Sequence, residues 1–151
     1  MTLTGPLLVG ARDVTAEKHF RAVNPATGEQ LEPEFACATQ ADVDAACRLA
    51  AEAFDPYRAL SFAARADFLD TIALCLGEDI DARAGLETAL PEARLKGEMG
   101  RTMGQLRLFA TLVRQGEWSE PRIDPAQPDR APMPRAALRQ RQIGVGPVAG
   151  F

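Results

Sequence analysis

The residue types that most often supply a nucleophile or a general base are scarce in this chain, which has three cysteines and one histidine. Cys37, Cys47 and Cys75 are odd in number and widely spaced, so they indicate neither a disulfide framework nor a zinc site. Each lies among apolar residues, which predicts a small buried side chain in a reducing compartment. His19 has no nucleophile or metal ligand beside it in the sequence, so we expect it at the surface.

Two glycine-rich stretches could in principle bind phosphate groups. Gly97, Gly100 and Gly104 have the spacing GxxGxxxG, not the GxGxxG of dinucleotide-binding loops, and no strand precedes them. They lie inside a helical pattern, so we expect them to let another element pack closely against that helix. Residues 144–147 (GVGP) lack a following helix because proline comes directly after the second glycine. This pattern favours the start of a strand.

The charged residues form no catalytic set either. Glu87, Glu92 and Glu98 fall on helical segments as solvated charges, and no carboxylate pair, Ser-His-Asp set or metal-ligand cluster emerges. A run of arginines without intervening acids lies at Arg130, Arg135, Arg139 and Arg141. We interpret it as a solvated arm or a subunit contact, not a nucleic-acid interface. The residues alone therefore predict no catalytic, cofactor-binding or metal-binding position.

The composition is that of an ordinary globular protein. The 151 residues are 46% hydrophobic with a net charge of −4, which argues against disorder and against general affinity for nucleic acids or anionic membranes. The N-terminal residues lack the pattern of a secretory signal, and no apolar run approaches the ~20 residues of a membrane span. We expect a cytoplasmic protein.

The expected secondary structure changes along the chain from strands to helices and then to an extended arm. Residues 6–10, 19–23 and 34–38 are strand-like, with turn chemistry at 24–29, so a hairpin is expected. Thr39 and Asp42 fit a helix capping box, and Pro56, Gly77 and Gly116 mark expected helix ends. Helices are expected at about residues 40–55, 61–76, 80–90 and 92–115. Repeated prolines in residues 118–134 predict an extended, exposed arm, and strand-like sequence returns after residue 136.

Several segments, in order, resemble the N-terminal part of the aldehyde dehydrogenases. Residues 23–29 resemble the hairpin turn of that family. The first two helices of the family are similar to residues 45–54, 57–58 and 65–69. Residues 143–149 resemble the first strand of its nucleotide-binding sheet. Residues 87–95 and 100–109 are more specific. They are similar to the branch that oxidises α-ketoglutarate semialdehyde (2,5-dioxopentanoate), usually with NADP. The resemblance spans essentially the whole chain.

The resemblance implies an α/β fold, as the truncated N-terminal part of an aldehyde-dehydrogenase-like fold. It would comprise a β-hairpin, about four helices, an extended arm and the first strand of the nucleotide-binding sheet. Residues 1–116 would form the hairpin and the helical layer of the cofactor domain. Residues 117–142 would form a Pro-rich oligomerisation arm, and residues 143–151 the first strand of the truncated nucleotide-binding domain.

The resemblance also implies a chemistry. In the family a cysteine thiolate attacks the aldehyde, backbone and asparagine donors stabilise the oxyanion, hydride passes to NADP or NAD, and a glutamate-activated water releases the carboxylate. Those residues follow later in the family sequences, so none of the three cysteines here inherits the nucleophile's role. We expect no NADP or NAD to bind this chain alone.

Two function hypotheses follow. The first is a fragment of an NAD(P)-dependent aldehyde dehydrogenase that oxidises a semialdehyde, inactive alone and arising from a truncated, frameshifted or split coding sequence. The alternative is a non-enzymatic helical interaction module that binds a protein partner, such as a full-length paralogue. In both cases apolar faces built for a missing sheet would be exposed. We therefore expect a marginally stable chain that self-associates or pairs through residues 117–142.

Overall fold

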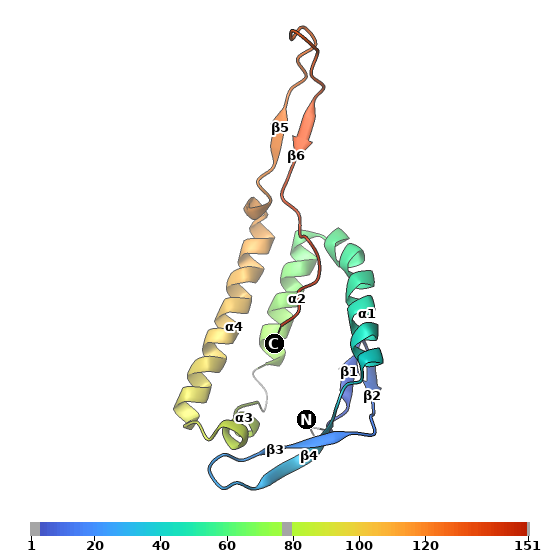
Figure 1. Cartoon of the computed structure of the whole chain (residues 1–151). Coiled ribbons are helices and arrows are strands. Elements are labelled where there is room, and N and C mark those ends of the chain that lie inside the picture. The colour runs from blue at the N-terminus through green and yellow to red at the C-terminus, as the bar shows by residue number, and fades with distance from the viewer. Residues whose placement is uncertain (1–3, 77–79, 151) are drawn as a thin grey trace.

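The computed structural model describes residues 4–76 and 80–150 (Figure 1). The strands are β1 (Leu7–Val9), β2 (Arg12–Val14), β3 (His19–Val23), β4 (Gln30–Ala36), β5 (Arg122–Asp124) and β6 (Leu138–Gln140). The helices are α1 (Gln40–Ala59), α2 (Phe62–Cys75), α3 (Ile80–Thr88), α4 (Glu92–Gln115) and the short 3-10 helix η1 (Glu117–Ser119). The predicted helix end at Gly77 lies outside the described residues.

Two antiparallel hairpins open the chain. β1 pairs with β2, a strand that the sequence did not predict, and β3 pairs with β4 as predicted, with an irregularity between Arg21 and Val23. The turn between β3 and β4 follows from its residues. The backbone N–H of Gly28 donates to the carbonyl of Asn24 at 2.8 Å, and Gly28 has a φ of 76°, which glycine tolerates.

Helix α1 begins at the predicted capping box. The Asp42 N–H donates to the Thr39 hydroxyl, and the Asp42 carboxylate accepts from the Thr39 N–H at 2.8 Å. The prediction that Pro56 ends this helix is wrong, because α1 continues to Ala59. The ring of proline fixes φ at a value that a helix also uses. Proline lacks only one N–H donor, so a helix can continue through it. The helix ends where Leu60 becomes extended, with a ψ of 151°.

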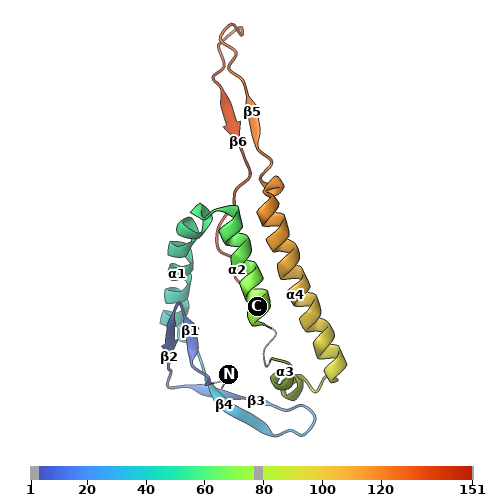
Figure 2. The ribbon, with the colours of Figure 1, turned by 180° about the vertical axis from the view of Figure 1, so that it is seen from behind.

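Helices α2 and α4 lie side by side and antiparallel (Figures 1 and 2). Ser61 caps α2, and α4 ends at Gly116, both as predicted. Small residues line this contact: Ala66, Ala73 and Ala110 have no exposed surface. Such residues let two helices approach closely. Among the described residues, no large apolar side chain is fully buried, so this core is shallow.

The arm, residues 117–142, projects away from the helices in both views (Figures 1 and 2). Beyond η1, which includes the buried Ser119, the arm is extended and mostly exposed, as predicted. Its two sides pair as the antiparallel strands β5 and β6, with a further bridge between Gln127 and Arg135. The prolines lie outside these two short strands, so they do not interrupt the hydrogen-bonded ladder.

Residues 143–149, predicted from the sequence to begin a strand of a larger sheet, form no strand among the described residues. The segment is assigned no strand, and Val145 and Val148 are 100% and 89% exposed. A strand is defined by its hydrogen-bonded neighbours, and the described residues place none beside this segment. Residues 143–149 are therefore apolar, but they have no hydrogen-bonded neighbouring strand among the described residues.

Candidate functional site

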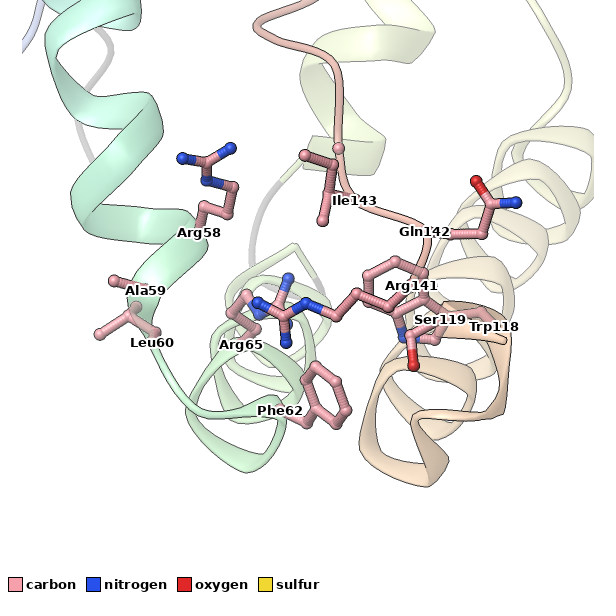
Figure 3. Close-up of a pocket in the computed structure, with 11 residues that line it drawn as sticks. Arg58, Ala59, Leu60, Phe62, Arg65, Trp118, Ser119, Arg141, Gln142 and Ile143 are labelled. Carbon is pink, nitrogen blue, oxygen red and sulfur yellow. The ribbon is translucent and has the colours of Figure 1, made fainter. Parts of the chain in front are cut away.

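A hollow lies at the base of the arm and is here called the arm-base cavity; its volume is about 150 Å³ (Figure 3). It lies where the end of α1, the start of α2, η1 and the chain after β6 meet. Its lining residues are Arg58, Ala59, Leu60, Phe62, Arg65, Trp118, Ser119, Arg141, Gln142, Ile143 and Gly144.

Local backbone geometry brings these segments together. Gly116 adopts a left-handed φ of 76° at the end of α4, which turns the chain into η1. A side chain at Gly116 would meet the Phe62 ring, because an ideal Cβ there would lie 2.6 Å from Cε2 of Phe62. The returning chain is held by the Gln142 N–H, which donates to the Ser119 carbonyl at 2.7 Å. The cavity therefore depends on a close helix-to-helix approach that glycine permits.

Arg65 is held against two aromatic rings. Its guanidinium carbon lies 5.0 Å from the Phe62 ring centroid and 5.7 Å from the Trp118 ring centroid. The two rings are themselves in contact, with centroids 5.8 Å apart. Cation–π attraction of this kind fixes the orientation of a guanidinium as well as stabilising it.

The cavity is cationic and incompletely hydrogen-bonded. Nε of Arg65 and Nε1 of Trp118 are buried and have no hydrogen-bond partner. Arg58 pairs with Asp55, whose carboxylate is 2.7 Å away, but no acidic residue lines the cavity. An anion would accept hydrogen bonds from these donors and would balance the positive charge of the arginines.

The groups whose pKa values shift lie elsewhere and are explained by local structure. Hydrogen bonds from Thr39 lower the pKa of Asp42 at the start of α1. A hydrogen bond from Arg101 lowers the pKa of Glu98, the carboxylate predicted to be a solvated charge on a helix. Both are exposed helix-stabilising contacts, so neither indicates acid–base catalysis.

The cysteines are less buried than predicted. Cys47 and Cys75 are exposed and Cys37 is half-buried, so the prediction of three buried cysteines is wrong. The helical faces that carry Cys47 and Cys75 are not covered by another element of the described structure. His19 is exposed on β3, as predicted. No group of three or more histidine, cysteine or acidic residues in the described ranges could hold a metal ion.

The glycines of α4 do not receive a packed neighbour. A Cβ added at Gly97, Gly100 or Gly104 would meet nothing within 4 Å, so the predicted close packing is absent from the described structure. This face of α4 is open space, and no loop with phosphate-binding geometry forms, because all three glycines are helical.

The run of arginines is dispersed along the arm and does not act as one patch. Arg130 lies in the loop between the strands, and Arg135 approaches Asp124 at 3.9 Å. Arg139 lies on β6, and Arg141 lines the arm-base cavity. No sequence motif predicts that Arg65, Trp118 and Arg141 line one cavity, because they are far apart along the chain.

Comparison with protein-family models decides the family. The model of the aldehyde dehydrogenase family matches residues 12–145. The chain belongs to this family. None of the described helices combines the length and hydropathy needed to cross a membrane.

Semialdehyde dehydrogenases are among the family members that this chain is similar to. It is 52% identical to alpha-ketoglutaric semialdehyde dehydrogenase 2 of Azospirillum brasilense, over 100% of this chain and 30% of that protein. It is 51% identical to alpha-ketoglutaric semialdehyde dehydrogenase of Acinetobacter baylyi, over 78% of this chain and 23% of that protein. It thus spans less than a third of the length of these relatives.

Solved structures of the family confirm the α/β fold. PnpE in complex with nicotinamide adenine dinucleotide matches with a TM-score of 0.71 and 26% identity, over 82% of this chain and 26% of that chain. A NAD-dependent benzaldehyde dehydrogenase from Corynebacterium glutamicum matches with a TM-score of 0.71 over 84% of this chain and 27% of that chain, at 23% identity. Most of this chain therefore shares its fold with part of these dehydrogenase structures.

Proposed function

We propose that this chain is the N-terminal part of an NAD(P)-dependent aldehyde dehydrogenase that oxidises α-ketoglutarate semialdehyde to the carboxylate. The observation that carries the proposal is the 52% identity to the Azospirillum enzyme across the whole chain. A succinate-semialdehyde dehydrogenase named for NADP, from Mycobacterium tuberculosis, is 35% identical over 62% of this chain. Both relatives are named for an aldehyde that carries a carboxylate, which supports a semialdehyde substrate.

The chain alone is inactive in this proposal, and it contributes scaffold but no catalytic or cofactor-binding residue. The arrangement of its potential nucleophiles supports this view. His19 is paired with Ala36 across β3 and β4, and Cys37 follows Ala36. Cys37 lies just beyond the end of β4 and is half-buried, whereas His19 is exposed on β3. Cys47 and Cys75 are exposed on two different helices.

The three parts of the chain would have separate roles. Residues 1–116 would flank the cofactor domain, and residues 143–151 would supply its first strand. The arm, residues 117–142, would join an oligomerisation sheet. Its two-stranded ribbon supports this role, since each outer edge presents backbone groups that another strand can pair. The three cysteines are free thiols, which supports a cytoplasmic location.

A chimera tests whether this chain can serve as the N-terminal scaffold of such an enzyme. This chain would replace the corresponding N-terminal part of the Azospirillum enzyme, and nicotinamide reduction would be followed with α-ketoglutarate semialdehyde. We expect oxidation at a rate comparable to that of the parent. A soluble, folded chimera that does not oxidise α-ketoglutarate semialdehyde would contradict the proposal.

The isolated chain tests the inactivity. Supplied with the same aldehyde and with NAD or NADP, the purified 151-residue protein is expected to reduce no nicotinamide. Measurable turnover would show that the chain carries its own catalytic residues. Capture of one stoichiometric protein partner by the isolated chain would instead favour a non-enzymatic interaction module.

A further inference from the structure

The arm-base cavity brings like charges together without a counter-charge of its own. Figure 3 shows the side chains of Arg65 and Arg141 directed toward one another across the hollow. Two guanidinium groups in a partly enclosed site repel each other, because the local dielectric is lower than that of water. Arg58 adds a third guanidinium, part of whose charge is offset by Asp55. The arrangement favours a bound negative charge.

Unused hydrogen-bond donors point to the same conclusion. Nε of Arg65 and Nε1 of Trp118 are buried without partners, which is unfavourable for a hydrogen-bond donor removed from water. Arg65 cannot easily turn its guanidinium toward solvent, because its cation–π contacts with Phe62 and Trp118 hold it in place. A ligand with acceptor oxygens would satisfy these donors without moving the aromatic rings.

We propose that the arm-base cavity binds a small free oxyanion, either a phosphate or a carboxylate. Guanidinium groups match the paired oxygens of both ligands, and the bonds are strengthened by charge. Arg65 and Arg141 are the direct ligands, and the Trp118 N–H is a further donor. The volume of about 150 Å³ is below the roughly 300 Å³ of the smallest usual organic-ligand pockets, so a nucleotide is too large. This proposal does not depend on the proposed function.

The chain contains a built-in probe for this site, because Trp118 is its only tryptophan. The purified 151-residue protein would be titrated with sodium phosphate and, separately, with sodium glutarate while Trp118 fluorescence is recorded. Ionic strength would be held constant with sodium chloride, since salt screens every surface charge. We expect a saturable change, and the anion that saturates at lower concentration identifies phosphate or carboxylate as the ligand class.

Three variants separate a site from general charge attraction. Arg141→Gln should weaken binding by at least about tenfold, equivalent to about 1.4 kcal/mol. Arg65→Lys, which keeps the charge but loses the planar fork, should also weaken it. Arg139→Gln removes the same charge from β6, outside the cavity lining, and should bind as the unaltered chain does. Circular dichroism would confirm that each variant keeps its helices.

The proposal would be overturned by either of two results. One is the absence of a saturable change with both anions, or an equal change with chloride alone. The other is an equal loss of affinity in Arg139→Gln and Arg141→Gln, which would show attraction by net charge only. Neither measurement involves an aldehyde or a nicotinamide, so the outcome is independent of the enzymatic assignment.

Discussion

Replacing Gly116 by alanine should destabilise the contact between α2 and α4 through two separable effects. The residue has a φ of 76°, and the left-handed conformation costs an L-residue about 1–2 kcal/mol. The new Cβ would also lie 2.6 Å and 2.7 Å from two ring carbons of Phe62. That ring is held between Trp118 and Arg65, so it cannot simply move aside. Overpacking of this kind costs about 1–3 kcal/mol. We expect a total loss of about 2–5 kcal/mol in the free energy of unfolding.

Gly28 provides a matched control for the backbone term. It has the same φ of 76°, but a Cβ there would meet nothing within 4 Å. Gly28→Ala should therefore cost only the conformational part, about 1–2 kcal/mol. The assay is urea unfolding followed by helical circular dichroism, at protein concentrations low enough for monomer to dominate. The difference between the two variants measures the clash with Phe62.

A double mutant tests the cause directly. Phe62→Leu removes the ring carbons that the new Cβ would meet, so Gly116→Ala should cost about 1 kcal/mol less in that background than in the unaltered chain. Equal losses for Gly116→Ala and Gly28→Ala would refute the steric argument. A cost of Gly116→Ala that is unchanged by Phe62→Leu would do the same.

Three further outcomes are expected. Hydrogen bonds from Thr39 hold the pKa of Asp42 below its ordinary value of 3.8, so this contact stabilises α1 above that pH and is lost as the pH falls through the lowered value. Thr39→Val should raise the pKa of Asp42 in an NMR titration. Arg114 on α4 pairs with Asp67 and Asp70 on α2 at 2.9 and 2.8 Å, so Arg114→Gln should lower the urea midpoint, and less so at high salt. Light scattering should show a self-associating chain, and a monodisperse monomer that unfolds sharply would contradict this.

The helix ends could be read from the sequence because they are made by short-range contacts. The Thr39 hydroxyl and the Asp42 carboxylate interact within a single turn of α1, and Ser61 accepts the N–H of Ala64 in the same way at the start of α2. Gly116 ends α4 because its own backbone conformation requires glycine. None of these features depends on what covers the helix, so local chemistry suffices to predict them.

The exposure of the cysteines and the state of residues 143–149 could not be predicted in the same way. The apolar neighbours of Cys47 and Cys75 show that a face is suited to burial, but they cannot show that another layer covers it. An apolar run such as residues 143–149 likewise becomes a strand only beside a partner. The arm-base cavity was missed because it joins side chains from four segments, which only the Gly116 turn and the returning arm bring together.

The packing of this chain leaves most of its large apolar side chains outside the core. Among the described residues, the fully enclosed apolar side chains are alanines, whereas Leu8, Leu74 and Val145 are 80%, 68% and 100% exposed. Burial of large apolar groups is the main stabilising term in a folded domain. In this chain the small apolar side chains are enclosed and the large ones face outward. Such an arrangement favours packing of further elements against more than one side. We therefore expect these exposed apolar surfaces to drive association, in a chain that spans less than a third of its relatives' length.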